Sequence, residues 1–383
     1  MPTGRCLSAI FEAMSVYWNG TKRPKPNLMR KLSPLLLLAL LFTAARGLNA
    51  QDAHFSQYYT FAQALNPALT GNFEGSYRFA AIYRNQWRSF LGTNAYVTPG
   101  AAIDVTLFEG QLKTDKLGMG LMVYNDRFGE GSISTLNTAF SLAYHKGFGK
   151  KGLHRLSLGA QVAFVQKSFD DDASTFYDQF DELTHGAGFA TTENFQQGSY
   201  FFFDYNFGLY WKSSFSKRVA AQGGFSVWHV SQPQEYFIVD DEDFYLPMRY
   251  VFDAGAQVFV DRKYKVSVSP DVLYQRQGGF GEQDFQEILV GGSVGYHFNS
   301  GFRTNSSMHV GARYRVSPAN TDGLVVLGQV EFRNLRIGGA YDINLSELTE
   351  STDTRGGFEV SLVYMGESIR SYKADRSLPA RRF

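Results

Sequence analysis

The chain has 383 residues with a formal net charge of +1, and only 19% of the residues are charged. This balance gives no reason to expect a nucleic-acid partner. Its single cysteine, Cys6, precedes the export signal described next, so the exported chain is predicted to lack disulfides, cysteine-based metal sites and a cysteine nucleophile. Aromatic residues reach 16% and there are 38 glycines, a composition typical of outer-membrane barrels.

The amino-terminal region has two parts. Residues 1–28 show no coherent pattern, and we interpret them as a spurious or extended amino terminus ahead of Met29. Residues 29–50 combine a basic start (Arg30, Lys31), a short apolar run over 35–42 and a small-residue cleavage site ending at Ala50. This pattern predicts a secretory signal peptide that is cleaved before Gln51, because the apolar run is too short to span a bilayer.

Residues 51–76 are polar and aromatic without sustained alternation, and Asn66-Pro67 and Thr70-Gly71 are turn signals. We expect this stretch to be a periplasmic or plug segment.

From Tyr77 onward, apolar and polar residues alternate with a period of two, which places one row on each face of a sheet. About fourteen segments repeat this pattern at roughly the 9–11 residues of a tilted membrane strand. The predicted strands lie near 77–87, 96–107, 117–126, 133–145, 154–165, 200–211, 218–229, 249–260, 264–275, 286–298, 308–316, 324–333, 335–343 and 357–365.

No segment reads as a helix that could cover the apolar face, so lipid is the simplest solvent for it. A sheet in lipid must close, because an open edge would leave backbone groups unpaired. The sequence therefore predicts an all-β fold over 77–366, a transmembrane antiparallel up-and-down β-barrel of about 14 strands. Both termini would be periplasmic, with a polar tail over 367–383. Pro270 lacks a ladder donor and predicts a β-bulge.

The connections support one orientation. If the first strand runs outward, the connections after odd strands are external and include the long, acid-rich stretches 166–199, 230–248, 276–285 and 344–356. The other connections are mostly shorter and basic. Long external loops and short periplasmic turns are the rule for outer-membrane barrels.

Motifs that suggest enzymes have simpler interpretations. Residues 147–152 fit GxGxxG, but a strand follows instead of a helix, so we expect a tight turn. Residues 291–295 fit GxSxG, but Ser293 falls mid-strand and is interpreted as a small lumen residue. His145, His229 and His297 are expected near the rims or in the lumen. No cofactor or metal is predicted. An outer-membrane lipase or protease is the enzyme alternative, but no catalytic set can be assembled.

Charged residues on the inward rows leave two alternatives open. They could line an open pore, or they could form a salt-bridged lattice. The residues concerned are Glu331, Arg333, Arg336 and Asp342.

Three stretches of the sequence resemble one family. The first is the start, Gln51-Asp52 and Phe55-Ser56-Gln57-Tyr58, followed by Asn66-Pro67-Ala68 and Gly71. The second is Tyr83-Arg84-Asn85-Gln86-Trp87, and the third is the closing hairpin, Gly339-Ala340-Tyr341-Asp342 through Leu345 and Leu348 with Phe358 to Tyr364. Together they resemble the PorP/SprF family. The chain departs from the family at Gly357-Phe358-Glu359, where a His-Glu pair is frequent, and at the end, Ala380-Arg381-Arg382-Phe383, where Cys-Pro-Arg-Phe is frequent.

The resemblance implies an integral outer-membrane component of the type IX secretion system of the Bacteroidetes. Such proteins assist secretion and surface attachment of adhesin-type cargo with a C-terminal targeting domain, and some are linked to gliding motility. The implied partners are outer-membrane lipid, other type IX components and the cargo. A passive diffusion porin is the alternative.

Two groups of residues are candidate partner contacts. Aromatic residues of the long connections would hold cargo: Phe176, Tyr177, Phe180, Tyr236, Phe237, Phe244 and Tyr245. The motif residues would bind a partner or, equally, only pack inside the barrel: Gln51, Asp52, Phe55, Ser56, Gln57, Tyr58, Asn66, Pro67, Gly71, Arg84, Gln86 and Trp87.

Overall fold

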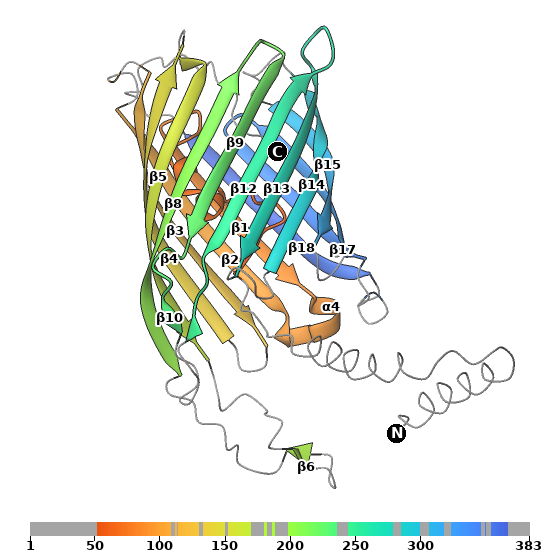
Figure 1. Cartoon of the computed structure of the whole chain (residues 1–383). Helices are drawn as coiled ribbons and strands as arrows, with labels where there is room; N and C mark the ends of the chain where they lie inside the picture. Colours follow the sequence, from red (N-terminus) through yellow and green to blue (C-terminus); the bar gives the residue numbers. More distant parts are fainter. Residues whose placement is uncertain are drawn as a thin grey trace, which may run out of the picture. The chain divides into compact units, whose positions relative to one another are not determined.

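The structure is a computed structural model that describes part of the chain. It covers residues 52–108, 112, 114–129, 133–149, 152–169, 180–181, 186–187, 198–235, 244–278, 285–298, 306–317, 323–345, 349 and 354–366. The predicted signal peptide and the tail over 367–383 lie outside these residues. The described chain forms a closed barrel of antiparallel strands (Figure 1).

Each barrel strand pairs with the strands before and after it, and β1 pairs with β18 to close the ring, as the sequence predicted. The closing ladder runs in register from the pair Tyr77–Gly366 to the pair Gln86–Gly357. The fourteen strands are β1 (Tyr77–Gln86), β2 (Tyr96–Leu107), β3 (Lys116–Phe128), β4 (Ile133–Phe148), β5 (His154–Ser168), β8 (Ser199–Ser214), β9 (Val219–Trp228), β12 (Arg249–Phe259), β13 (Val266–Gln277), β14 (Phe285–His297), β15 (Ser306–Val316), β16 (Gly323–Phe332), β17 (Leu335–Asn344) and β18 (Arg355–Gly366).

Short elements occupy the connections and the segment before β1. Two small hairpins pair β6 (Phe180–Asp181) with β7 (Gly186–Ala187) and β10 (Gln234–Glu235) with β11 (Phe244–Tyr245). The helical turns are α3 (Ala62–Leu65), η1 (Pro67–Leu69), α4 (Arg88–Leu91) and η2 (Gly92–Asn94). None of the helices in the described residues is long and apolar enough to cross a membrane.

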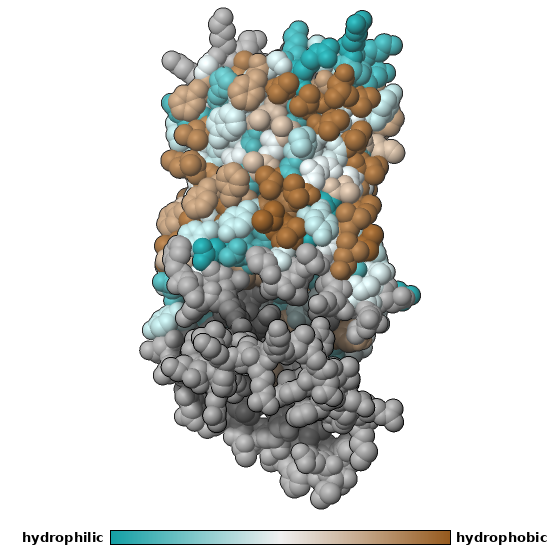
Figure 2. All heavy atoms as spheres, turned by 45° about the vertical axis from the view of Figure 1, so that its right-hand side comes forward, coloured by the Kyte–Doolittle hydropathy of each residue, from teal (hydrophilic) through white to brown (hydrophobic). Residues whose placement is uncertain are grey.

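The predicted alternation appears as two faces of the wall. On β17, Ile337 and Tyr341 are exposed on the outside, whereas Arg336 and Asp342 are buried in the lumen. Apolar side chains therefore cover the outer wall, and hydrophilic ones gather at the upper rim (Figure 2). The inward row is not purely polar, since Val325 and Leu327 also face inward and pack in a buried apolar cluster.

The barrel has two different ends. We call the end reached after β1, β3, β5, β9, β13, β15 and β17 the long-loop end, because it carries the connections over 169–198 and 229–248. The opposite end, with turns such as Arg333-Asn334 between β16 and β17, is the short-turn end. The first strand starts and the last strand finishes at the short-turn end.

Two expectations about single residues are wrong. No bulge occurs at Pro270, since β13 pairs with β14 without a register shift and keeps its register with β12 on either side of Pro270. A shift occurs instead between Asp342 and Ile343. Arg333 does not face the lumen, because it occupies the turn after β16 with a positive φ of 54° and an exposed side chain.

Candidate functional site: a segment threaded through the barrel lumen

Residues 52–75, which we call the plug, cross the lumen from one end of the barrel to the other. Asp52 lies at the long-loop end, where its N–H donates to Gln277 Oε1 at 3.3 Å. At the short-turn end, the Ser76 N–H donates to the Gly366 carbonyl at 2.8 Å. Between these points, nearly every plug residue is buried. Below, residues 52–58 are called the strap and residues 59–73 the stopper.

Ser56 is the centre of a charged network that joins the strap to the wall. Its hydroxyl donates to Asp342 Oδ1 at 2.7 Å and accepts from Arg84 Nη1 at 2.8 Å and Arg315 Nη2 at 2.9 Å. Arg84 and Arg315 also form ion pairs with Asp342, at 2.8 and 3.1 Å. Of the two alternatives for the lumen charges, the salt-bridged lattice therefore applies to Asp342, and Arg336 likewise lies 3.7 Å from Glu331.

Glu359 binds the strap backbone. Its carboxylate accepts from the Ser56 N–H at 2.9 Å and from the Gln57 N–H at 2.7 Å, and it pairs with Arg84 at 3.2 Å. The Gln57 side chain accepts from Ser361 Oγ at 2.8 Å. Hydrogen bonds to an ionised carboxylate are stronger than those between neutral groups. Glu359 therefore holds the strap backbone at Ser56 and Gln57 against β18.

The first strap residue belongs to a second charged cluster. Asp52 Oδ2 lies 2.6 Å from His229 Nε2 and 3.3 Å from Arg249, and His229 Nδ1 lies 3.0 Å from Asp204. Burial lowers the pKa of His229, but the carboxylates of Asp52 and Asp204 raise it more, so that the pKa is raised to about 9. Burial raises the pKa of Asp52, but His229 and Arg249 hold it well below its usual range. Both groups are therefore charged at neutral pH.

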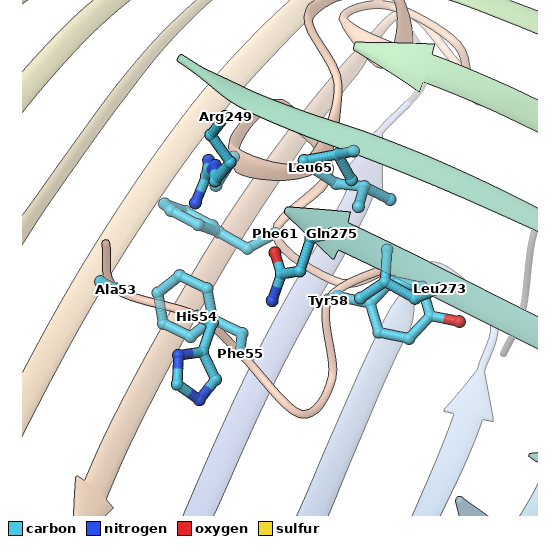
Figure 3. A pocket seen from close by; sticks show the side chains of 11 residues that line it. Ala53, His54, Phe55, Tyr58, Phe61, Leu65, Arg249, Leu273 and Gln275 are labelled. Carbon is cyan, nitrogen blue, oxygen red and sulfur yellow. The ribbon is translucent and has the colours of Figure 1, made fainter. Parts of the chain in front are cut away.

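A small cavity lies between the strap and the wall. Its volume is about 30 Å³, and it is bordered by His54, Phe55, Tyr58, Arg249 and Gln275 among others (Figure 3). This is room for about two water molecules and not for an organic ligand. Burial lowers the pKa of His54 to about 4, so this side chain is neutral at pH 7.

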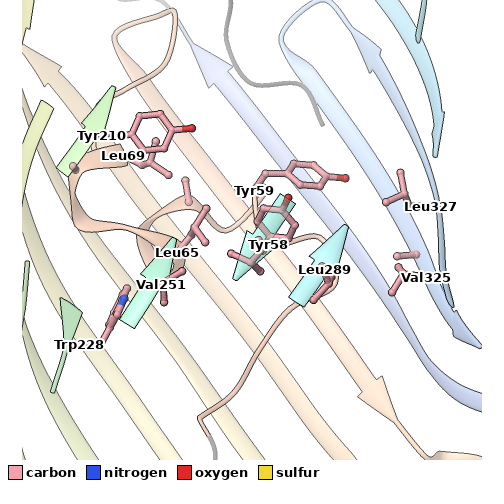
Figure 4. Close-up of a cluster of buried hydrophobic side chains, with 14 residues drawn as sticks. Tyr58, Tyr59, Leu65, Leu69, Tyr210, Trp228, Val251, Leu289, Val325 and Leu327 are labelled. Atoms are coloured by element: carbon pink, nitrogen blue, oxygen red, sulfur yellow. The ribbon is translucent and has the colours of Figure 1, made fainter. Parts of the chain in front are cut away.

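Aromatic residues join the strap to the stopper. The Tyr58 hydroxyl donates to Asp271 at 3.0 Å, and Arg313 pairs with Asp271 at 2.7 Å while lying over the rings of Tyr58 and Tyr59 at 5.4 and 5.1 Å. Burial raises the pKa of Tyr59 to about 12. Apolar side chains of the plug and of the inward rows pack around this point (Figure 4).

Asn66 orders the stopper turn. Its side-chain oxygen accepts from the Ala68 N–H at 2.9 Å, which caps η1 with Pro67 in the first turn. Its amide nitrogen donates to the carbonyls of Leu209 at 3.1 Å and Phe225 at 3.2 Å. The Asn-Pro turn is therefore bonded to two barrel strands as well as to itself.

Inward-facing glycines let the stopper backbone approach the wall. A Cβ on Gly159 would lie 2.6 Å from the Ala68 Cα, and one on Gly118 would lie 2.6 Å from the Thr70 carbonyl carbon. Neither distance is possible between real atoms, so these positions require glycine as long as the stopper is in place. The wall and the stopper are complementary in shape as well as in hydrogen bonding.

Side chains near the short-turn end fix the last plug residues. The Gly71 N–H donates to Asp104 at 2.6 Å, and Arg78 binds the same carboxylate through two nitrogens at 2.9 and 2.7 Å. Lys116 Nζ donates to the Phe73 carbonyl at 3.0 Å. His145, buried in the lumen, lies 2.8 Å from the Thr70 carbonyl.

The structure brings most of the predicted motif residues together as plug–wall contacts. The strap and stopper supply Asp52, Phe55, Ser56, Gln57, Tyr58, Asn66, Pro67 and Gly71, and the wall supplies Arg84, whose Nη2 donates to Gln86 at 3.1 Å. Trp87 lies apart at the long-loop rim, edge-on to Tyr96 with ring centroids 5.4 Å apart. Gln51 lies outside the described residues, as do the side chains of the candidate loop aromatics except that of Tyr245, which is exposed.

Sequence reasoning missed the wall residues that hold the plug, chiefly Glu359, Arg315 and Asp104. The available signal was a charge on an inward row, but alternation alone does not reveal which inward charge meets the plug. Ser293 was correctly placed, buried and inward on β14. Within the described part of the chain, no cluster of three or more metal-ligating side chains is present.

The sequence matches, over residues 47–364, the family described as "Type IX secretion system membrane protein PorP/SprF". The chain belongs to this family. Membership agrees with the resemblance drawn from the sequence motifs in the plug, the first strand and the last two strands. It places this PorP/SprF protein among the secretion-system membrane proteins, and its closed barrel is of the outer-membrane kind.

The solved structures to which the chain is similar include two toluene transporters and a monoaromatic hydrocarbon channel. The Ralstonia pickettii toluene transporter TbuX is 12% identical with a TM-score of 0.46, and the similarity covers 79% of this chain and 92% of that one. The P. putida toluene transporter TodX is 12% identical with a TM-score of 0.43, and the similarity covers 81% of this chain and 95% of that one. The monoaromatic hydrocarbon channel CymD is 10% identical with a TM-score of 0.44, and the similarity covers 83% of this chain and 95% of that one. Among curated proteins, no sequence matches this PorP/SprF chain.

Proposed function

We propose that this barrel holds adhesin-type cargo at the outer membrane. In this role it works with other type IX components to assist secretion and surface attachment of proteins that carry a C-terminal targeting domain, and it contributes to gliding motility where the cargo is a motility adhesin. The observation that carries the proposal is the plug, because a barrel whose lumen is filled by its own chain is suited to anchoring and recognition instead of diffusion. Recognition then falls to the ends of the barrel.

The same observation argues against the passive diffusion porin. Solutes would have to pass a segment that is bonded to β1, β2, β4, β8, β9 and β17 among other strands. We expect purified protein to give no large, steady current in planar bilayers. A stable open-channel conductance in the unmodified protein would favour the porin instead.

We propose that the long-loop end faces the cell surface and the short-turn end the periplasm, after signal-peptide cleavage at Ala50. Support comes from the general rule that outer-membrane barrels carry long external loops and short periplasmic turns. The acid-rich connections 169–198 and 229–248 would then be available to cargo, and outer-membrane lipid would contact the apolar wall.

Deletion of residues 52–71 tests the role of the plug, with cargo display on intact cells as the readout. Heat-dependent mobility in gels establishes whether the barrel still inserts and folds. We expect the deleted barrel to insert and cargo display to fall. Normal insertion with normal display would restrict the motif residues to packing and remove their proposed part in secretion.

A further inference from the structure

One side of the barrel wall extends well past its neighbour at the long-loop end. Strands β5 and β8 contain 15 and 16 residues, whereas β9 contains 10. The β8–β9 ladder ends at the pair Phe207–Val227, but the β8–β5 ladder continues to the pair Ser199–Ser168. Residues 199–206 of β8 therefore have a strand partner on one side only.

The hydrogen-bonding direction of this edge follows from its ladder. The Phe169 N–H donates to the Gly198 carbonyl, and the Ser214 N–H donates to the Leu153 carbonyl, so the even-numbered residues of β8 bond to β5. Antiparallel strands alternate the side to which they bond, and the backbone groups of Phe201, Phe203 and Tyr205 therefore point away from β5. The Val230 N–H, which donates to the Tyr205 carbonyl at 3.1 Å, confirms this direction.

The chain after β9 leaves the edge at Tyr205. Beyond it, the Phe203 carbonyl has only a long contact of 3.5 Å from Ser231 Oγ. No partner in the described chain meets the Phe203 N–H or the two backbone groups of Phe201 on this side. The following residues instead run over the lumen face, where Glu235 pairs with Lys167. An unpaired edge of this kind is a template for another strand.

The same edge carries exposed aromatic rings. Phe201 and Phe203 are 64% and 54% exposed on the outer face, and both contact Phe164, with ring centroids 5.4 and 5.9 Å apart. Residues 199–205, rising about 3.3 Å each on a strand tilted by about 40°, reach about 18 Å beyond the end of β9. An open edge is not tolerated in hydrocarbon, so this stretch must lie outside the membrane core. Aromatic groups exposed there mark an interaction surface.

We propose that residues 199–205 of β8 form a docking edge for an extended strand of the partner protein. This inference rests on the proposed function and names the site at which the barrel holds its cargo. The added strand would continue the β8–β9 interface along the same edge, with backbone bonds to Phe201 and Phe203. Its alternate side chains would be apolar and lie beside the exposed rings. The partner chemistry is thus a strand from the edge of a β-sheet domain, a recognised mode of peptide capture.

The substitution Phe203→Pro tests the edge directly. Proline removes the N–H that points to the open side and leaves the β5 ladder intact, because that ladder uses the even-numbered residues. Phe203→Ala is the matched control, since it removes the ring and keeps the N–H. The readout is surface display of the proteins that disappear from intact cells when the barrel gene is deleted. We expect Phe203→Pro to reduce display at least about tenfold and Phe203→Ala to reduce it less, with heat-dependent gel mobility unchanged.

Wild-type display by a folded Phe203→Pro barrel would overturn the docking edge and leave the proposed function in place. If that variant does not fold, Phe201→Pro makes the same change nearer the end of the hairpin, and its display decides the question in the same way. If deleting the gene changes no surface protein, the proposed function itself fails.

Discussion

The strap and the stopper are held to the barrel wall by different balances of contacts. The strap is fixed by charged side chains: Ser56 and Gln57 are bonded to Glu359 and Asp342, and Asp52 to His229. The stopper depends more on shape, because its backbone lies directly against inward glycines such as Gly159 and Gly118, in addition to its hydrogen bonds to the wall. Ionic contacts respond to pH and to competing ligands, whereas backbone contact over glycine does not. The strap is therefore the half that can be released without unfolding the barrel.

The largest change in conductance is expected from Gly159→Val, which displaces the stopper and leaves the strap contacts intact. Its side chain would need the space occupied by the backbone of Ala68, and overpacking of this kind costs about 1–3 kcal/mol even when neighbours adjust. The stopper should move away from β5, and planar bilayers should show a steady current that the parent lacks. Gly328→Val is the matched control, because a Cβ there meets nothing within 4 Å. Equal, parent-like currents from both variants would contradict a stopper fixed by shape.

Glu359→Ala should release the strap and leave the stopper in place. It removes the acceptor of two buried backbone N–H groups, which should weaken the attachment of the strap to the wall by about 2–3 kcal/mol. Because the predicted exported chain lacks cysteine, an Ala53→Cys reporter can be alkylated selectively. Its alkylation should speed up by a factor of about 30 or more, without any new current in bilayers. An unchanged rate would show that Glu359 does not hold the strap.

Asn66→Ala should weaken the turn of the stopper. It removes the cap of η1 and the bonds to Leu209 and Phe225, and loss of such a cap costs about 1 kcal/mol. We expect a lower unfolding temperature with intact insertion and only brief current openings. Asn66→Asp retains the capping oxygen but turns a second acceptor oxygen toward the carbonyls of Leu209 and Phe225, so its unfolding temperature should be at least as low as that of Asn66→Ala. If Asn66→Asp behaves as the parent does, the bonds to the wall carry little of the effect.

Alkaline pH should have the smallest effect, and only on the strap. The pKa of His229 is raised to about 9, above its ordinary value of about 6.5. The stabilisation that protonated His229 gives to the bound strap is therefore complete below pH 6.5 and is lost as the pH rises through 9. Alkylation of the Ala53→Cys reporter should rise between pH 7.5 and pH 10, relative to a Ser216→Cys reporter in the exposed β8–β9 turn. His229→Gln should remove this pH dependence, and a dependence that persists would assign it to other groups.

Much of the wall could be predicted because its signal is local. The residues of one strand show which face meets lipid, so β2 was bounded correctly at Tyr96–Leu107. Pro270 was misjudged because an outward-facing proline fits an otherwise regular ladder with only a brief interruption on the side of β12. The plug contacts were out of reach, since Ser56 and Asp342 are separated by 286 residues in the chain. An inward charge has the same appearance in the sequence whether it meets water or a threaded segment.

By itself, the sequence determined a two-faced wall, its closure into a ring and the family to which the chain belongs. The tertiary structure decided the path of the chain before that wall. An even number of strands brings the start of β1 and the end of β18 to one end of the barrel, as expected, yet the plug carries Asp52 through the lumen to the other end. The physical reason is that the alternation of apolar and polar residues is a property of each strand by itself. The plug, in contrast, is positioned by charges and glycines on strands that are far apart in the sequence and come together only when the ring closes.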